Sequence, residues 1–161
     1  MTKLNWALVI ALGIMLLPLI AGQLGVWSGR APADLGVREG RLAAPRPTPN
    51  NVHSQAALHG PAYVQAQIDP LQLRDGDATA TMTRLRTLIE ATPGAQVVQA
   101  QPDYLYIRYT TRWMRFVDDT EFWADPTSGV VQVRSASRVG RSDLGVNRTR
   151  IEDLRRRLAA R

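Results

Sequence analysis

The chain has 161 residues, enough for one domain with short additional segments, and hydrophobic residues make up 45 % of it. It contains no cysteine, which excludes disulfide bonds, thiolate metal sites and cysteine nucleophiles. The last 31 residues hold nine arginines against three carboxylates, so they carry the whole net charge of +6. Such a basic end could meet anionic lipid, nucleic acid or an acidic partner, or it could be a solvated helix end.

An uncharged stretch near the N-terminus predicts a transmembrane helix over residues 4–27. About 20 apolar residues suffice to cross a bilayer, and Trp6 and Trp27 flank the stretch as interfacial anchors do. The alternative is a signal peptide that is cleaved before Gly22 or before Gly29. We expect an uncleaved anchor, because the residues before Gly22 make a poor cleavage site.

Residues 28–62 have the composition of an extended tether. Their prolines suppress helix formation, and the sequence "PRPTPNN" at 45–51 suits an extended run along a surface. The only two histidines of the chain, His53 and His59, lie in this segment with no carboxylate between them. We expect surface histidines here rather than metal ligands.

The α+β domain is predicted for residues 63–161, and its first helix follows the tether. Asp77 is a suitable N-cap for this helix, and Pro93-Gly94 is a stop signal. Helical spacing places the larger apolar side chains on one face, which predicts a core helix that carries no chemistry. This apolar face consists of Met82, Leu85, Leu88 and Ile89.

Four β-strands are predicted after this helix, at residues 95–101, 104–111, 115–124 and 130–139. The second strand alternates apolar and polar residues and is rich in β-formers. The last two strands are joined by "DPTSG" at 125–129, a five-residue hairpin loop with glycine at its end.

A final helix is predicted for "NRTRIEDLRRRLAA", with Asn147 as its N-cap and apolar residues at helical spacing. The element order is therefore α-β-β-β-β-α. This order predicts an α+β fold in which two helices cover one face of an antiparallel four-stranded meander.

The third and fourth strands bring clustered carboxylates opposite an arginine. If Arg134 faces Glu121, it lies diagonal to Asp119; if it faces Thr120, it lies diagonal to Asp118. Either register places a carboxylate within reach of the guanidinium. We therefore interpret this segment first as a salt-bridged hairpin, and second as a surface that binds a ligand or a partner.

The same three carboxylates allow an alternative in which they bind a divalent cation and act as acid and base. Ser135 or Ser137 could be a nucleophile, and Arg138 could steady an anion. A nucleophilic serine needs a nearby base, however, and the only lysine is Lys3 while both histidines lie in the tether. Serine catalysis is therefore not expected.

The sequence "RVGRSDLGVN" predicts a loop that turns at two glycines. Gly140 and Gly145 permit positive φ, and Asp143 could accept hydrogen bonds from backbone amides of the loop. Since the loop ends at the predicted helix cap, it could also hold an anion at Asn147, with help from Arg148 and Arg150. No nucleic-acid-binding motif is present, so nucleic-acid binding is not expected.

Two motifs carry a resemblance to a known family. The pair "RFVDDTEF" and "VRSASRVGRSDLGVNRTRI" resembles the bacterial and plastid family called domain of unknown function 1499, over about residues 35–158. Many members carry two cysteines near the positions of Pro45 and Asn51, so any disulfide or metal role of that segment cannot operate here. The resemblance implies no activity, but it does imply membrane or envelope association.

These patterns predict a membrane-anchored envelope domain that binds a partner or an anionic ligand without catalysis. The alternative is a metal-dependent enzyme that uses the three hairpin carboxylates. No cofactor, metal or catalytic residue is expected under the first interpretation. The candidate binding or structural motif comprises Asp118, Asp119, Glu121, Arg134, Ser135, Ser137, Arg138, Gly140, Asp143, Gly145, Asn147 and Arg150.

We expect the protein to be a single-pass protein of the bacterial inner membrane with its domain in the periplasm. An early N-terminal anchor usually exports the domain that is attached to it. The arginines after the anchor pull weakly toward the cytoplasm, so a cytoplasmic domain stays open. These arginines are Arg30, Arg38, Arg41 and Arg46.

Overall fold

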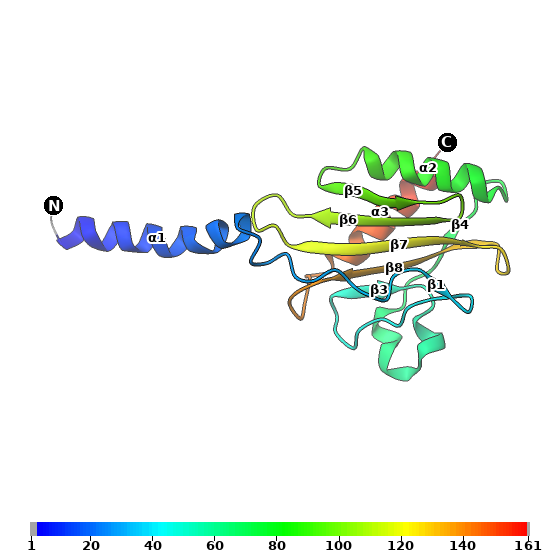
Figure 1. Ribbon diagram of the computed structural model, residues 1–161, viewed down its shortest axis with the longest axis horizontal. Coiled ribbons are helices and arrows are strands. Elements are labelled where there is room, and N and C mark those ends of the chain that lie inside the picture. Colours follow the sequence, from blue (N-terminus) through cyan, green and yellow to red (C-terminus); the bar gives the residue numbers. More distant parts are fainter. Residues whose placement is uncertain (1–2, 161) are drawn as a thin grey trace.

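The computed structural model describes residues 3–160; Arg161, the last residue of the predicted domain, lies outside them. A long helix, α1 (Lys3–Gln23), projects from one end of an α+β domain (Figure 1). Within α1, the stretch Asn5–Gln23 is long and apolar enough to cross a membrane, and almost all of it is exposed. This weakly suggests a single-pass anchor.

The domain is built on an antiparallel six-stranded sheet. Its order is β3-β8-β7-β6-β5, and β4 also pairs with β8. The strands are β3 (Asn51–His53), β4 (Leu71–Gln72), β5 (Ala95–Ala100), β6 (Tyr104–Thr110), β7 (Val117–Asp125) and β8 (Val130–Ser137).

The expected four-stranded meander is therefore correct for β5 to β8 but incomplete. Two short strands, β3 and β4, pair with β8, which would otherwise be an exposed edge. The segment 28–62, expected to be an extended tether, thus lies against the sheet and contributes β3. Strands of two or three residues are too short to show the alternation from which a strand is predicted.

Two helices cover one face of the sheet, as predicted. The first is α2 (Ala78–Glu90), and the Asp77 side chain caps it by accepting a hydrogen bond of 2.9 Å from the amide of Ala80. The second is α3 (Val146–Ala159), which lies behind the sheet in Figure 1. Their buried apolar residues join inward residues of the strands in the main core, with Phe122, Ile107 and Val133 fully buried.

The start of α3 differs from the prediction. Gly145 is the N-cap, with φ of 81°, and Asn147 lies inside the first turn, fully buried. The helix begins earlier because Asp143 provides the capping carboxylate, which leaves the Asn147 side chain free to point into the domain.

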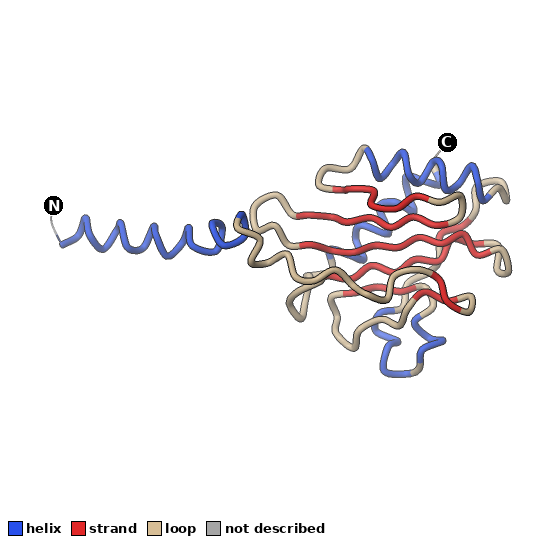
Figure 2. The backbone as a smooth tube through the Cα atoms, viewed as in Figure 1, coloured by secondary structure: helices blue, strands red, loops and turns tan. Residues whose placement is uncertain are grey.

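The chain between α1 and β3 covers the opposite face of the sheet. It contains a small hairpin, β1 (Val37–Arg38) and β2 (Arg41–Leu42), and crosses in front of β7 and β8 (Figures 1 and 2). Leu42 packs there with Tyr104, Tyr106 and Trp123 in a second apolar cluster. Two short 3₁₀ helices, Ala56–His59 and Pro61–Ala66, complete the connection to β4.

Candidate functional site

The hairpin β7–β8 adopts the register in which Arg134 faces Glu121, one of the two registers expected. Arg134 Nη1 lies 2.7 Å from Glu121 Oε2, and both side chains are buried. Arg138 donates two hydrogen bonds to Asp119, of 2.7 and 2.8 Å. Each of these carboxylates therefore has its own guanidinium.

The third carboxylate of the cluster, Asp118, lies on the other face of the sheet. Successive residues of a strand point to opposite faces, so Asp118 faces the helices while Asp119 and Glu121 face β1 and β2. Asp118 accepts a hydrogen bond of 2.8 Å from Arg150 of α3. Within residues 3–160, no three His, Asp or Glu side chains come together as a possible set of metal ligands.

Glu121 connects the sheet to the segment that covers it. Its Oε1 accepts hydrogen bonds of 2.7 Å from the Tyr104 hydroxyl and from the amide of Gly36. Arg134 extends the contact by donating to Asp34 at 3.0 Å. Burial, and then the adjacent Glu121 carboxylate, raise the pKa of Tyr104, so this hydroxyl remains a donor. These bonds hold residues 34–36 on the sheet.

Asp119, near the start of β7, is also held by a tyrosine and an arginine. Tyr106 donates a hydrogen bond of 2.6 Å to Asp119 Oδ1, which also accepts one from Arg138. Burial and the hydrogen bond to Asp119 raise the pKa of Tyr106 to about 12. The bond to Asp119 likewise raises the pKa of Arg138 above its ordinary value. Tyr106 and Arg138 therefore both keep their protons at physiological pH and remain donors to Asp119.

The predicted serines belong to a buried network beneath α3. Ser137 donates to Asp118 at 2.6 Å, and Ser135 donates to Asn147 Oδ1 at 2.5 Å. Asn147 in turn donates to Ser137 at 3.1 Å, and Thr120 lies 2.6 Å from the Ser135 hydroxyl. No histidine or lysine enters these contacts, so neither hydroxyl has the kind of base that a nucleophilic serine usually needs. The network attaches α3 to the sheet.

The loop before α3 already holds an anion of its own. Asp143 accepts hydrogen bonds from the amides of Gly145, at 3.0 Å, and Asn147, at 2.8 Å. Gly140 and Gly145 both have φ of 81°, the left-handed conformation expected of them. Arg150 is bonded to Asp118 and lies over the Tyr109 ring at 4.1 Å. The helix N-terminus is therefore occupied by the Asp143 carboxylate.

His53 is a correction to the expected surface histidines, because its side chain is fully buried in β3. Nδ1 accepts a hydrogen bond of 2.8 Å from the amide of Gln55, and Nε2 lies 3.0 Å from the carbonyl of Ala43, to which it must donate. Burial lowers the pKa of His53 from 6.5 to about 4, and the positive charge of neighbouring Arg134 acts in the same direction. The ring is therefore neutral in the folded protein.

A cavity at the end of the sheet nearest α1 was not predicted from the sequence. Its volume is about 580 Å³, and we call it the basic pocket; three arginines line it and no carboxylate does. The sequence signal was present in "TTRWMRF", the loop between β6 and β7, but its arginines meet the other lining residues only in the fold. The basic pocket is lined by Thr92, Pro93, Gly94, Tyr109, Thr110, Thr111, Arg112, Arg115 and Arg150.

Two features of the basic pocket bear on what it could bind. Arg112 and Arg115 are exposed and make no ion pair with any described residue. The Tyr109 hydroxyl is buried and has no hydrogen-bond partner among the described residues. The basic pocket thus combines positive charge that no described carboxylate neutralises with a buried hydroxyl that has no partner.

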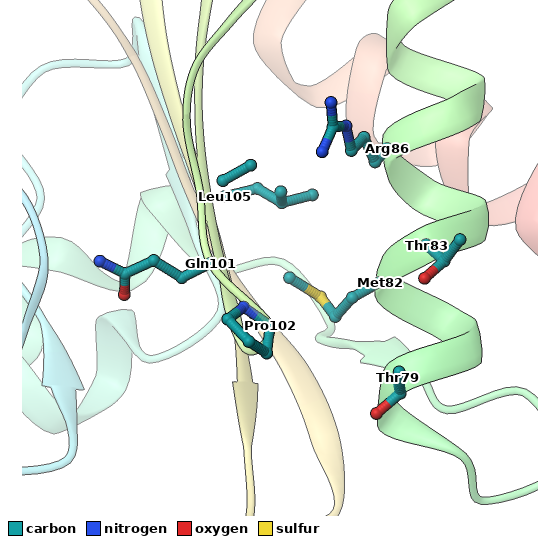
Figure 3. Close-up of a pocket in the computed structure, with 8 residues that line it drawn as sticks. Thr79, Met82, Thr83, Arg86, Gln101, Pro102 and Leu105 are labelled. Carbon is teal, nitrogen blue, oxygen red and sulfur yellow. The ribbon is translucent and has the colours of Figure 1, made fainter.

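Arg86 and Arg155 to Arg157 are already engaged by other groups of the chain. A pocket of about 280 Å³ between α2 and β6 contains Arg86 (Figure 3), which is paired with Glu90 at 2.8 Å. The basic C-terminal end lies away from α1, and Arg155 donates there to the carbonyls of Asp69 and Pro70. Arg156 and Arg157 both pair with an aspartate one turn earlier in α3.

Comparison with known proteins gives one result. Residues 41–158 match the model of a family described as protein of unknown function (DUF1499), which confirms the resemblance carried by the hairpin and loop motifs. No curated protein and no solved structure matches the chain.

The buried pair predicts a strong energetic coupling between Arg134 and Glu121. Arg134→Met should lower the free energy of unfolding by about 3–5 kcal/mol, because it leaves a buried carboxylate without its cation. Arg86→Met breaks an exposed pair and should cost less than about 1 kcal/mol. Urea unfolding of the full chain in mild detergent measures both.

The double variant Arg134→Met/Glu121→Gln completes the test. It should recover part of the loss of the single variants, because no lone buried charge remains. If the losses of Arg134→Met and Glu121→Gln add up to the loss of the double variant to within about 0.5 kcal/mol, the two residues are not coupled. The structural interpretation is then wrong.

The depressed pKa of His53 predicts that the protein becomes less stable as the pH is lowered. Between about 6.5 and 4 the unfolded chain binds a proton that the folded chain does not, so the free energy of unfolding decreases as pH falls through this window. The loss is on the order of 3 kcal/mol. Thermal unfolding at a series of pH values measures it, and a His53→Gln variant should have a flatter profile. An unchanged profile in that variant would contradict the assignment.

Proposed function

The chain belongs to the DUF1499 family, whose description names no activity, and we propose that its domain is a non-catalytic binding module. In this proposal α1 anchors the domain in the membrane, and the basic pocket takes a small anionic ligand. The observation that carries the proposal is the free charge of that pocket: Arg112 and Arg115 face no carboxylate, whereas the arginines of the acidic hairpin are all paired.

The chemistry of the lining suits phosphate or carboxylate groups. Guanidinium groups bind such oxygens through charge-assisted hydrogen bonds. Thr110 and Thr111 line the same pocket and can supply hydroxyl donors. Burial raises the pKa of Tyr109 to about 12, so its unpartnered hydroxyl keeps its proton and can also donate.

The acidic hairpin has a structural role in this proposal. Asp118, Asp119 and Glu121 each satisfy a different arginine and are divided between the two faces of the sheet. The metal-dependent enzyme drawn from these carboxylates therefore gains no support from their arrangement. Their pairs position the ends of β7 and β8, from which the loops beside the basic pocket extend.

The proposal also includes the location of the protein. We place α1 across the bacterial inner membrane and the domain in the periplasm, as an early uncleaved anchor would do. The uncharged, apolar stretch Asn5–Gln23 of α1 supports the anchor. Ligand binding in the basic pocket is independent of which side the domain occupies.

Replacing Arg112 and Arg115 together should weaken anion binding. We expect the full chain in mild detergent to bind inorganic pyrophosphate at low ionic strength, measured by isothermal titration calorimetry. The variant Arg112→Gln/Arg115→Gln should bind at least about tenfold more weakly, because each lost bond to a charged group contributes about 1.5–3 kcal/mol.

Arg141→Gln is the matched control, since Arg141 is also exposed but does not line the basic pocket. It should leave the affinity unchanged. Equal affinity of the double variant and the parent chain would contradict the proposed site. Absence of pyrophosphate binding at low salt would contradict the proposed ligand class.

A further inference from the structure

The C-terminal end of α1 is packed against the domain instead of leading into a free tether. A Cβ on Gly22 would lie 2.5 Å from the carbonyl oxygen of Met114, so the helix and the β6–β7 loop touch without a side chain between them. Gln23 Nε2 donates at 2.9 Å to the carbonyl of Trp113. Trp27 stacks at a tilt on Phe116, with ring centroids 6.3 Å apart. The direction in which α1 leaves the domain is therefore fixed.

The face of the domain beside this junction carries exposed apolar side chains. Trp113 is 64 % exposed, and Leu144, in the loop before α3, is 94 % exposed. Residues Thr111–Val117 and Val139–Val146 contribute to one apolar pocket of about 250 Å³, so the two loops lie at the same end of the sheet. Leu144 also has φ of 55°, a strained backbone conformation for a leucine whose side chain is left exposed to solvent.

Exposed arginines lie in the same two loops as Trp113 and Leu144. Arg112, Arg115 and Arg141 are exposed, and none forms an ion pair within the described part of the chain. Arg112 lies over the Trp113 ring at 4.9 Å. We call these three arginines, with Trp113 and Leu144, the end face.

The end face lies where α1 would leave the bilayer. Trp113 and Arg112 share an open cavity with four residues of α1 and the turn after it, Leu19, Ile20, Gln23 and Leu24, so Trp113 stands beside the last apolar turn of the helix. Figure 1 shows α1 projecting from this end, with the β6–β7 loop at its base. Tryptophan with arginine is the combination found at membrane interfaces, where the ring enters the headgroups and the cation meets phosphate.

We infer that the domain rests with its end face on the bilayer that α1 crosses. Trp113 and Leu144 enter the headgroup region, and Arg112, Arg115 and Arg141 contact the phosphates of anionic lipids. The partner is the lipid surface, because the fixed junction with α1 leaves this face next to the membrane. The inference rests on the proposed anchoring by α1, and it does not require a ligand in the basic pocket.

Spin labels on single cysteines test this docking, since the chain has no cysteine of its own. Leu144→Cys reports on the end face, Gly13→Cys on the middle of α1, and Thr127→Cys on the hairpin turn at the opposite end of the sheet. The labelled full chain is reconstituted into vesicles of phosphatidylcholine and phosphatidylglycerol. Collision rates with oxygen, which is enriched in lipid, and with a water-soluble nickel chelate are compared.

We expect the label at residue 13 to be accessible to oxygen alone, and the label at 127 to be fully accessible to nickel. The label at 144 should lose most of its nickel accessibility. Trp113→Glu in the same labelled protein should restore that accessibility, because the charged side chain opposes insertion. In vesicles of phosphatidylcholine alone the protection at 144 should weaken, since the arginines lose their anionic partners.

Different failures have different meanings. If the label at 144 is as accessible to nickel as the label at 127 while residue 13 lies inside the bilayer, the docking is overturned and the anchor stands. The same result is expected if the end face binds a protein partner instead of lipid. A label at 13 accessible to nickel would overturn anchoring and docking together. Equal protection at 144 without phosphatidylglycerol would overturn the role given to the arginines.

Discussion

The buried carboxylate of Glu121 is the constraint on which much of this structure depends. A carboxylate that is 1 % exposed is costly unless its charge and its lone pairs are matched. Arg134 supplies the charge, and Tyr104 and Gly36 supply the remaining donors. Because these groups come from three separate parts of the chain, satisfying one side chain sets the β7–β8 register and draws the segment after α1 onto the sheet.

This constraint produces a division between the two ends of the molecule. The chain that satisfies Glu121 begins directly after α1, so α1 is held against the β6–β7 loop at one end of the sheet. The charged groups and serine hydroxyls of the acidic hairpin are already bound in ion pairs and in the hydrogen-bond network around Asn147. Arg112, Arg115 and Arg141, which form no ion pair with a described residue, lie at the end beside α1, and it is there that we propose both ligand binding and contact with lipid.

Local patterns in the sequence were sufficient for the elements that depend on local physics. The Asp77 cap, the apolar stripe of α2 and the alternation of the strands each predicted what the structure contains, and the hairpin charges gave the Arg134–Glu121 pair as one of two registers. The pattern failed where tertiary contacts decide. β3 has three residues and gains its stability from β8, His53 is buried by that pairing, and Asn147 is drawn into the core because Asp143 caps α3 instead. The basic pocket could not be predicted because its lining comes from separate loops and from α3.

Hydrogen–deuterium exchange of the full chain in lipid nanodiscs tests the central claim, that the motif residues support the fold while function lies at the end beside α1. The account predicts that replacing phosphatidylcholine by phosphatidylglycerol slows exchange in residues 111–116 and 140–146, and that adding pyrophosphate slows exchange in the pocket residues 92–94 and 110–115. Exchange in residues 118–137 should be slow under all conditions and should not respond. If exchange slows only in residues 118–137 and is unchanged in the two end loops, the account is contradicted. The acidic hairpin would then be the binding site.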